Sequence, residues 1–300
     1  MTNAVLPTHR DGLVALATAT DLVFVCNPAT RELVALPPGT RDARAVEDRA
    51  PAAAIAYDAA RDRYVVARYF YRDHRQFKDA DGKDWVDFEI GHEVFKLGGG
   101  GEWELTDDPP HAIGPARPIC ARDAVYWCTD HLEPNALLRF GLRDRAFDVV
   151  PFPPGADFHH GADHVTELSG KLCYVHPATK TAFDVWVADD DGGTRPEWRL
   201  RCRVDFDDYG GDVGWQALLP VAAAGDEMLI AADHRALYTY DARYRSVRKV
   251  VDMEKELKYA RADGSEFSDS DDDLAGLVHH VVPYVESLVP ISNRTKQKPG

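Results

Sequence analysis

Short apolar runs separated by turn-forming residues recur along the chain, and the first group of them lies between Asp11 and Pro38. The runs GLVALA, LVFVC and ELVAL have the length of ordinary β-strands. A break at Thr18–Asp21 separates the first two, and the turn Asn27-Pro28-Ala29-Thr30 separates the last two. A meander of this kind exposes an apolar face that it cannot cover alone, so the pattern predicts neighbours of the same kind.

Four further groups of strand-like runs follow. The second group is interrupted by the charged segment Arg72–Asp87, which we interpret as an insertion at the tip of a hairpin. The third to fifth groups each offer four runs in a row, such as RPICARD, AVYWCTD, ALLRFGLRD and AFDVVPFPP. Outside the second group, corresponding turns are roughly 45–50 residues apart, which is the period of propeller blades. These turns lie at Asn27, Gly98, Gly141, Ala188 and Asp241.

The repeats predict an all-β fold, a β-propeller of four-stranded antiparallel blades, with five blades visible and six possible. Runs such as AVYWC and KLCYV are almost continuously apolar, as expected for strands that are buried on both faces. The run EWRLRCRV alternates instead, as expected for an outermost strand. A doubly wound α/β fold would need amphipathic helices between its strands, and Met253–Ala262 is the one plausible helical segment, with a weak pattern.

The first group of runs lacks a fourth strand. Either the N-terminal AVLPTHR or the C-terminal HHVVPYVESLVPI supplies it, and we expect the C-terminal segment to do so, because closure would remove two free sheet edges. The expected organisation is a single propeller domain over 11–292 with an acidic loop at 263–273. Residues 1–10 form a tail or part of a first strand, and 293–300 form a C-terminal tail.

The composition of the chain disfavours several classes of binding partner and location. The 300 residues are 45% hydrophobic and carry a formal net charge of −15, which disfavours binding to nucleic acid or to an anionic membrane surface. No run is long enough to span a bilayer, and the first residues do not form a secretory signal. The five cysteines contain no CxxC pair, and we expect buried free thiols in an intracellular protein of the cytoplasm or nucleus.

Catalytic and metal-binding motifs are weak. The densest group of ligand-forming side chains, in PPGADFHHGADH around His159-His160, reads as an exposed polar loop. Neither a GxSxG nucleophile elbow nor a P-loop is present, and Gly98–Gly101 suits a hairpin. The sequence therefore predicts no enzyme, no catalytic residue, no metal and no cofactor.

Loops that join the second and third strands of each blade should emerge on the same face as the connections between blades. Aromatic and histidine side chains in these polar loops are candidates for contact with a protein partner. The candidate partner-binding residues are Phe77, Trp85, His131, Phe158, His159, Phe206, Tyr209 and Trp215.

Several motifs together resemble plant F-box-associated domains. Asp11-Gly12-Leu13, the run from Val25 to Arg31 and Leu36-Pro37-Pro38 are similar to the family's opening pattern. Further matches, in the family's order, are Ala56-Tyr57-Asp58, Tyr64-Val65-Val66, Ala124–Trp127, Phe147–Pro153, Phe183–Val187 and Tyr284–Val289. The resemblance implies a kelch-like propeller that binds a protein substrate for an SCF-type E3 ubiquitin ligase.

Members of this family usually begin with an F-box of roughly forty residues that docks the Skp1 adaptor. Only ten residues precede Asp11, and none resembles an F-box. We therefore expect Skp1 to bind only a longer form that carries an F-box. The alternatives are a free-standing propeller scaffold unconnected to ubiquitin, and a metal-dependent propeller hydrolase.

Overall fold

The computed structural model describes residues 6–18, 21–43, 52–78, 84–99, 101–130, 133–154, 163–189, 196–206, 218–258, 264 and 279–291. These residues form five four-stranded antiparallel sheets and one helix of four residues. In each sheet the strands pair in chain order. The prediction of an all-β propeller built from four-stranded blades is confirmed, and the described residues supply five blades.

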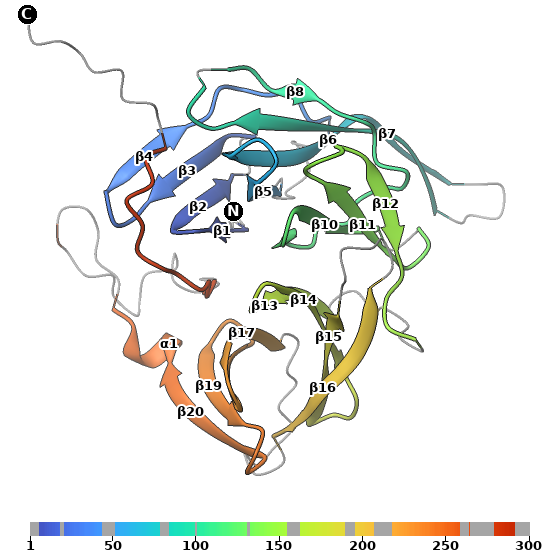
Figure 1. Cartoon of the computed structure of the whole chain (residues 1–300). Helices are drawn as coiled ribbons and strands as arrows, with labels where there is room; N and C mark the ends of the chain where they lie inside the picture. Colours follow the sequence, from blue (N-terminus) through green and yellow to red (C-terminus); the bar gives the residue numbers. More distant parts are fainter. Residues whose placement is uncertain are drawn as a thin grey trace, which may run out of the picture. The chain divides into compact units, whose positions relative to one another are not determined.

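Three blades belong to one compact unit, the three-blade unit, which includes Asn3–Pro151 and the C-terminal residues from Tyr284 onward. Its sheets run from blue to green in Figure 1. The strands of its first blade are β1 (Thr8–Arg10), β2 (Leu13–Ala17), β3 (Val23–Asn27) and β4 (Glu32–Ala35). Those of the second are β5 (Ala53–Asp58), β6 (Arg63–Lys78), β7 (Asp84–Lys96) and β8 (Glu104–Leu105). Those of the third are β9 (Ile119–Ala121), β10 (Ala124–Cys128), β11 (Leu137–Gly141) and β12 (Phe147–Val150).

Two blades belong to a second compact unit, the two-blade unit, formed mainly by Phe152–Asp191 and Pro196–Pro283. Its first blade contains β13 (His164–Leu168), β14 (Lys171–Pro177), β15 (Ala182–Asp189) and β16 (Glu197–Asp205). Its second contains β17 (Leu218–Ala224), β18 (Glu227–Ala232), β19 (Ala236–Asp241) and β20 (Ser246–Asp252). The helix α1 follows as Met253–Glu256, shorter than the expected Met253–Ala262, of which 259–262 lie outside the described residues.

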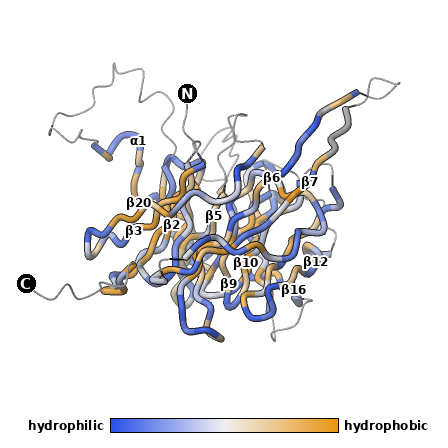
Figure 2. The backbone as a smooth tube through the Cα atoms, turned by 90° about the horizontal axis from the view of Figure 1, so that it is seen from above, coloured by the Kyte–Doolittle hydropathy of each residue, from blue (hydrophilic) through white to orange (hydrophobic). Residues whose placement is uncertain are grey.

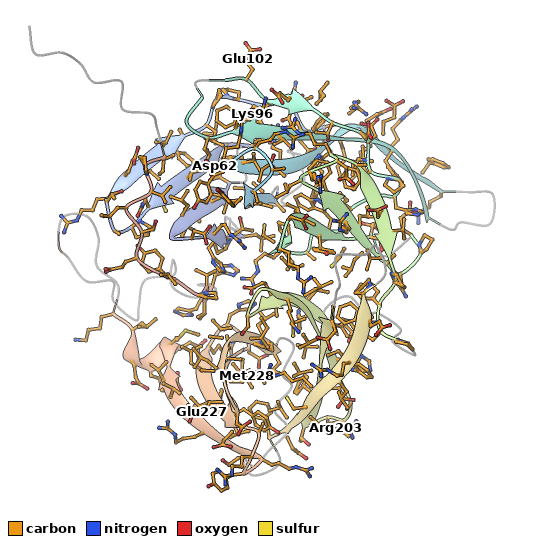
Figure 3. All side chains as sticks on the ribbon, in the orientation of Figure 1. Asp62, Lys96, Glu102, Arg203, Glu227 and Met228 are labelled. Carbon is orange, nitrogen blue, oxygen red and sulfur yellow. The ribbon has the colours of Figure 1, made fainter. Side chains whose placement is uncertain are left out.

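Burial follows the position of a strand within its blade. All five residues of β10 are buried, whereas β4 alternates between half-buried and exposed positions. In β18, Met228 is 2% exposed while its neighbour Glu227 is exposed, and Figure 3 labels both side chains. The inner strand β10 is therefore covered on both faces, whereas one face of the outermost strand β4 meets solvent.

The fourth strand of the first blade comes from the N-terminal side. β1 pairs with β2 in the register His9↔Val14, and the sheet order is β1-β2-β3-β4. The prediction that the C-terminal segment forms this strand is therefore wrong. Residues 279–291 are described but contain no strand, and Pro283 and Pro290, which lack a backbone N–H, interrupt any ladder that they could form.

The C-terminal segment nevertheless contacts the first blade, through Asn27 at the end of β3. The Asn27 amide nitrogen donates hydrogen bonds to the carbonyl oxygens of Ser287 and Val289, both at 2.9 Å. Its amide oxygen accepts from the backbone N–H of Ala29 at 3.0 Å and, at 3.4 Å, of Thr30, which shapes the Asn-Pro-Ala-Thr turn. Since Asn27 is fully buried, this one side chain both sets the turn and holds the C-terminal segment.

A buried ion pair in the second blade is bonded to the turn between β2 and β3 of the first blade and to the linker between the two blades. Arg68 of β6 and Glu93 of β7 are each 1% exposed, and Arg68 Nε donates to Glu93 Oε1 at 2.7 Å. Arg68 Nη1 donates to Asp21 in the β2–β3 turn at 2.6 Å, and Arg68 Nη2 donates to the carbonyl of Thr40. Thr40 in turn donates to Glu93 through its N–H at 3.0 Å and its hydroxyl at 2.8 Å. A Cβ at the neighbouring Gly39 would overlap Glu93 Oε1, so glycine lets the linker approach the pair.

The first prediction concerns Asn27. Asn27→Asp removes both N–H donors and places a charge against two carbonyl oxygens, so we expect the free energy of unfolding to fall by about 3 kcal/mol. Urea denaturation of the purified chain measures the change. Asn135→Asp, at an exposed position, is the matched control and should change little. Equal stability of the two variants would contradict the role given to Asn27.

The second prediction concerns the ion pair. Glu93→Gln leaves the Arg68 guanidinium buried beside a neutral amide, and we expect a loss of about 3 kcal/mol in the free energy of unfolding. The control is Glu102→Gln, because Glu102 is exposed and Figure 3 shows it pointing away from the ribbon. The difference in the free energy of unfolding between the wild type and Glu93→Gln should persist at high salt, since a buried pair is poorly screened. A difference that disappears at high salt would indicate a solvent-exposed interaction instead.

Candidate partner-binding site

The most prominent surface feature of the three-blade unit is a long hairpin. β6 and β7 continue beyond the strands that flank them, and Figure 2 shows their far end projecting from the unit. We call Arg72–Lys78 of β6 together with Asp84–Ile90 of β7 the β6–β7 arm. The insertion predicted at the tip of a hairpin is therefore built of strand, with only 79–83 outside the described residues.

The base of the arm is fixed by three sets of hydrogen bonds. Tyr71 donates its hydroxyl to the carbonyl of Ile113 at 2.8 Å and its N–H to Asp42 at 3.2 Å. Arg72 forms a bidentate pair with Asp108, both distances being 2.8 Å, and this pair raises the pKa of Arg72 and lowers that of Asp108. These contacts tie the arm to the linkers before and after the second blade.

A register shift marks the point where the arm begins. The ladder steps from Tyr71↔Ile90 to Asp73↔Glu89, so Arg72 is an extra residue on β6. The side chain of Arg72 reaches the carbonyl of Ile90 at 3.0 Å and lies over the ring of Phe70. Gly91 makes room for this arrangement, because a Cβ there would lie 2.5 Å from the Phe70 ring and 2.8 Å from Arg72.

The arm carries two of the predicted partner-binding residues. Phe77 of β6 is 52% exposed, a large apolar side chain at the surface. Trp85 lies opposite it in the ladder of β6 and β7. The backbone thus brings these two positions together, although they are eight positions apart in the sequence.

Of the other six predicted partner-binding residues, only Phe206 lies within the described residues. Phe206 is 2% exposed and packs edge-to-face against Tyr238, with ring centroids 5.5 Å apart. The prediction of an exposed side chain at Phe206 is therefore wrong, because the residue completes the core of the two-blade unit. The remaining five lie outside the described residues and stay predictions: His131, Phe158, His159, Tyr209 and Trp215.

Burial favours the neutral form of two histidines and one cysteine inside the blades. Burial lowers the pKa of His92 to about 3, and burial together with Arg117 lowers that of His9 to about 4. Burial raises the pKa of the Cys128 thiol to about 12, so it is a poor nucleophile at neutral pH. His92 Nδ1 lies 2.7 Å from the Thr106 hydroxyl, and its ring packs against Phe140, which is a packing role.

The cysteines and possible metal ligands were also predicted from the sequence. All five cysteines are free, but only Cys128 and Cys173 are buried; the expectation of burial is wrong for the half-buried Cys26, Cys120 and Cys202. Among the described residues, no group of three or more His, Cys, Asp or Glu side chains is placed to hold a metal ion.

No helix within the described part of the chain is long and apolar enough to cross a membrane.

Sequence reasoning missed the residues that position the arm. Arg72 and Asp108 are 36 residues apart and look like ordinary surface charges. The available signal was the alternation of Val86, Phe88 and Ile90 with Asp87 and Glu89, which is typical of a strand and not of a loop.

Comparison with known proteins identifies the family. The model of the F-box associated β-propeller domain matches residues 3–207, more than half of the chain and four of its five blades. Two putative F-box proteins of Arabidopsis thaliana are 24% identical over 240 residues and 27% identical over 210 residues. The matches cover 78% and 67% of this chain, but only 63% and 53% of the relatives' own length.

Among solved structures, an oligogalacturonate lyase in complex with manganese is 11% identical, with a TM-score of 0.49 over 83% of this chain and 64% of that one. A likeness at that identity carries no information on activity. The family model and the two plant relatives agree with each other, and the chain belongs to the F-box associated β-propeller domain family.

Proposed function

We propose that this chain is a non-catalytic interaction domain that binds the protein substrate of an SCF-type E3 ubiquitin ligase. The observation that carries the proposal is the β6–β7 arm, which presents the exposed Phe77 on a scaffold whose relatives are named as F-box proteins. A role inside the cell, in cytoplasm or nucleus, fits the five free thiols.

Rigidity of the arm's base supports a binding role. A partner that meets a preorganised surface loses less conformational entropy on binding than one that must order a loop. The Arg72–Asp108 pair and the Tyr71–Ile113 hydrogen bond supply this preorganisation. Exposed aromatic side chains on such a support are the usual energetic centres of protein interfaces.

The third prediction tests the arm. Proximity labelling with the wild-type chain identifies its partner, and Phe77→Ala should weaken capture of that partner at least tenfold, because truncating an interface aromatic costs about 2 kcal/mol. The matched control is Leu105→Ala in the same blade, since Leu105 is 63% exposed on β8, away from the arm. Equal loss in both variants, or loss in neither, would contradict a site on the arm.

The fourth prediction tests the link to ubiquitin. We expect the 300-residue chain alone not to retain purified Skp1, because F-boxes dock this adaptor through helices and the described residues contain one helix of four residues. The same chain fused behind an F-box should retain Skp1 and direct ubiquitin transfer to the captured partner. Adaptor binding without transfer would favour the free-standing scaffold, and retention by the unfused chain would overturn the expectation.

A further inference from the structure

We propose that the outer edge of β7 in the β6–β7 arm binds an extended, basic segment of the partner protein as an added β-strand. The proposal rests on the proposed function and names the mode of recognition at the same site. Strand addition obtains affinity from main-chain hydrogen bonds along an open sheet edge.

The edge of β7 is open because β8 is short. β8 pairs with β7 only at Glu93↔Leu105 and Val94↔Glu104, and Thr106 N–H adds a bond to the His92 carbonyl at 3.0 Å. The ladder stops there, since Asp107 and Asp108 are followed by two prolines, which have no N–H to donate.

The next outward carbonyl, that of Ile90, is taken by the side chain of Arg72 at 3.0 Å. Arg72 is itself bonded to Asp108, so the Arg72 side chain occupies the position at which the β7–β8 ladder would continue. Beyond it, from Asp84 to Glu89, β7 has a strand partner on the β6 side alone within the residues that the structure describes.

Alternation identifies which backbone groups face outward. The His92 carbonyl points away from β6, toward Thr106 after β8, and the direction of backbone groups alternates along a strand, so the Ile90 carbonyl also faces outward. The ladder shift between β6 and β7 adds its extra residue to β6, so the alternation continues unbroken along β7. The N–H and C=O groups of Phe88 and Val86 therefore face outward, while those of Glu89 and Asp87 pair with β6.

The opposite edge of the hairpin is capped at the same level, because the backbone of Tyr71 on β6 is bonded on its outer side by Asp42 and by the N–H of Ala43, the latter at 2.8 Å. Since β5 pairs with β6 only from Arg63 to Arg68, charge decides between the two edges of the arm. The stretch Asp73–Lys78 of β6 carries Arg75 and Lys78, which disfavour a basic segment, so the inference concerns β7. The open stretch of β7 has six residues and spans about 20 Å, enough for an added strand of similar length.

The acidic residues of β7 indicate which kind of segment would bind its open edge. The stretch Asp84–Glu89 contains three acidic residues and no basic one, in a chain with a formal net charge of −15. A second copy of this chain pairing through the same edge would bring acidic residues together, which is destabilising across strands. An extended segment in which Lys or Arg alternates with β-branched residues would be complementary in charge and in conformation.

The experiment compares two fluorescein-labelled peptides of equal charge, four Lys-Val repeats and four Lys-Pro repeats. The Lys-Pro peptide has half of its N–H donors removed and cannot add as a strand. Fluorescence anisotropy should show that the wild-type chain binds the Lys-Val peptide at least tenfold more tightly. Hydrogen exchange at the N–H groups of Val86 and Phe88 should slow on adding this peptide.

Two variants separate backbone from side chain. Val86→Pro removes one outward donor without touching the bonds to β6, and it should abolish the preference for the Lys-Val peptide. Val86→Thr keeps the N–H and should retain the preference. Equal binding of the two peptides to the wild-type chain, an unchanged preference in Val86→Pro, or unaltered hydrogen exchange would each overturn strand addition.

Failure of this inference can be told from failure of the proposed function. If capture of the natural partner depends on Phe77 but is unaffected by Val86→Pro, strand addition is rejected and the interaction site on the arm stands. If capture depends on neither residue, the proposed site fails as well.

Discussion

The buried pair of Arg68 and Glu93 is the interaction on which the three-blade unit depends. The two residues lie directly opposite each other in the ladder of β6 and β7. Toward the arm, Arg68 is the last residue of β6 that pairs with β5, and Glu93 is the last residue of β7 that pairs with β8. The pair therefore stands at the last level where β5 and β8 flank the hairpin, a few residues before the arm begins at Arg72. Two buried charges are costly unless each is well bonded, and here the linker and the β2–β3 turn supply the remaining bonds.

Strands that depend on local sequence patterns could be predicted, whereas those that depend on contacts between distant residues could not. The strands of the third to fifth blades were predictable because alternation and turn residues are local signals. The three residues of β1, Thr8–Arg10, carry no apolar pattern, and their place in the sheet comes from tertiary contacts such as the 3.0 Å hydrogen bond from the Thr8 hydroxyl to the Ala53 carbonyl. The far more apolar segment HHVVPYVESLVPI looked like the better strand.

Candidate site residues were harder to predict for a related reason. Phe77 and Phe206 both stand among charged neighbours, yet one is exposed and the other buried. What separates them is the neighbour across the fold: Phe206 meets Tyr238 and Phe183, while Phe77 lies beyond the last strand that could cover it. No local pattern encodes that difference.

Asn27 bonds to residues 260 and 262 positions further along the chain. During synthesis the first blade therefore leaves the ribosome long before its partner segment exists, and its completion waits for nearly the whole chain. Contacts of such separation slow folding, because the entropy of closing the loop is lost before the contact forms. In the interval, the turns at Gly12 and Asn27 lack their cover, which makes the nascent first blade the part of this protein most in need of a chaperone.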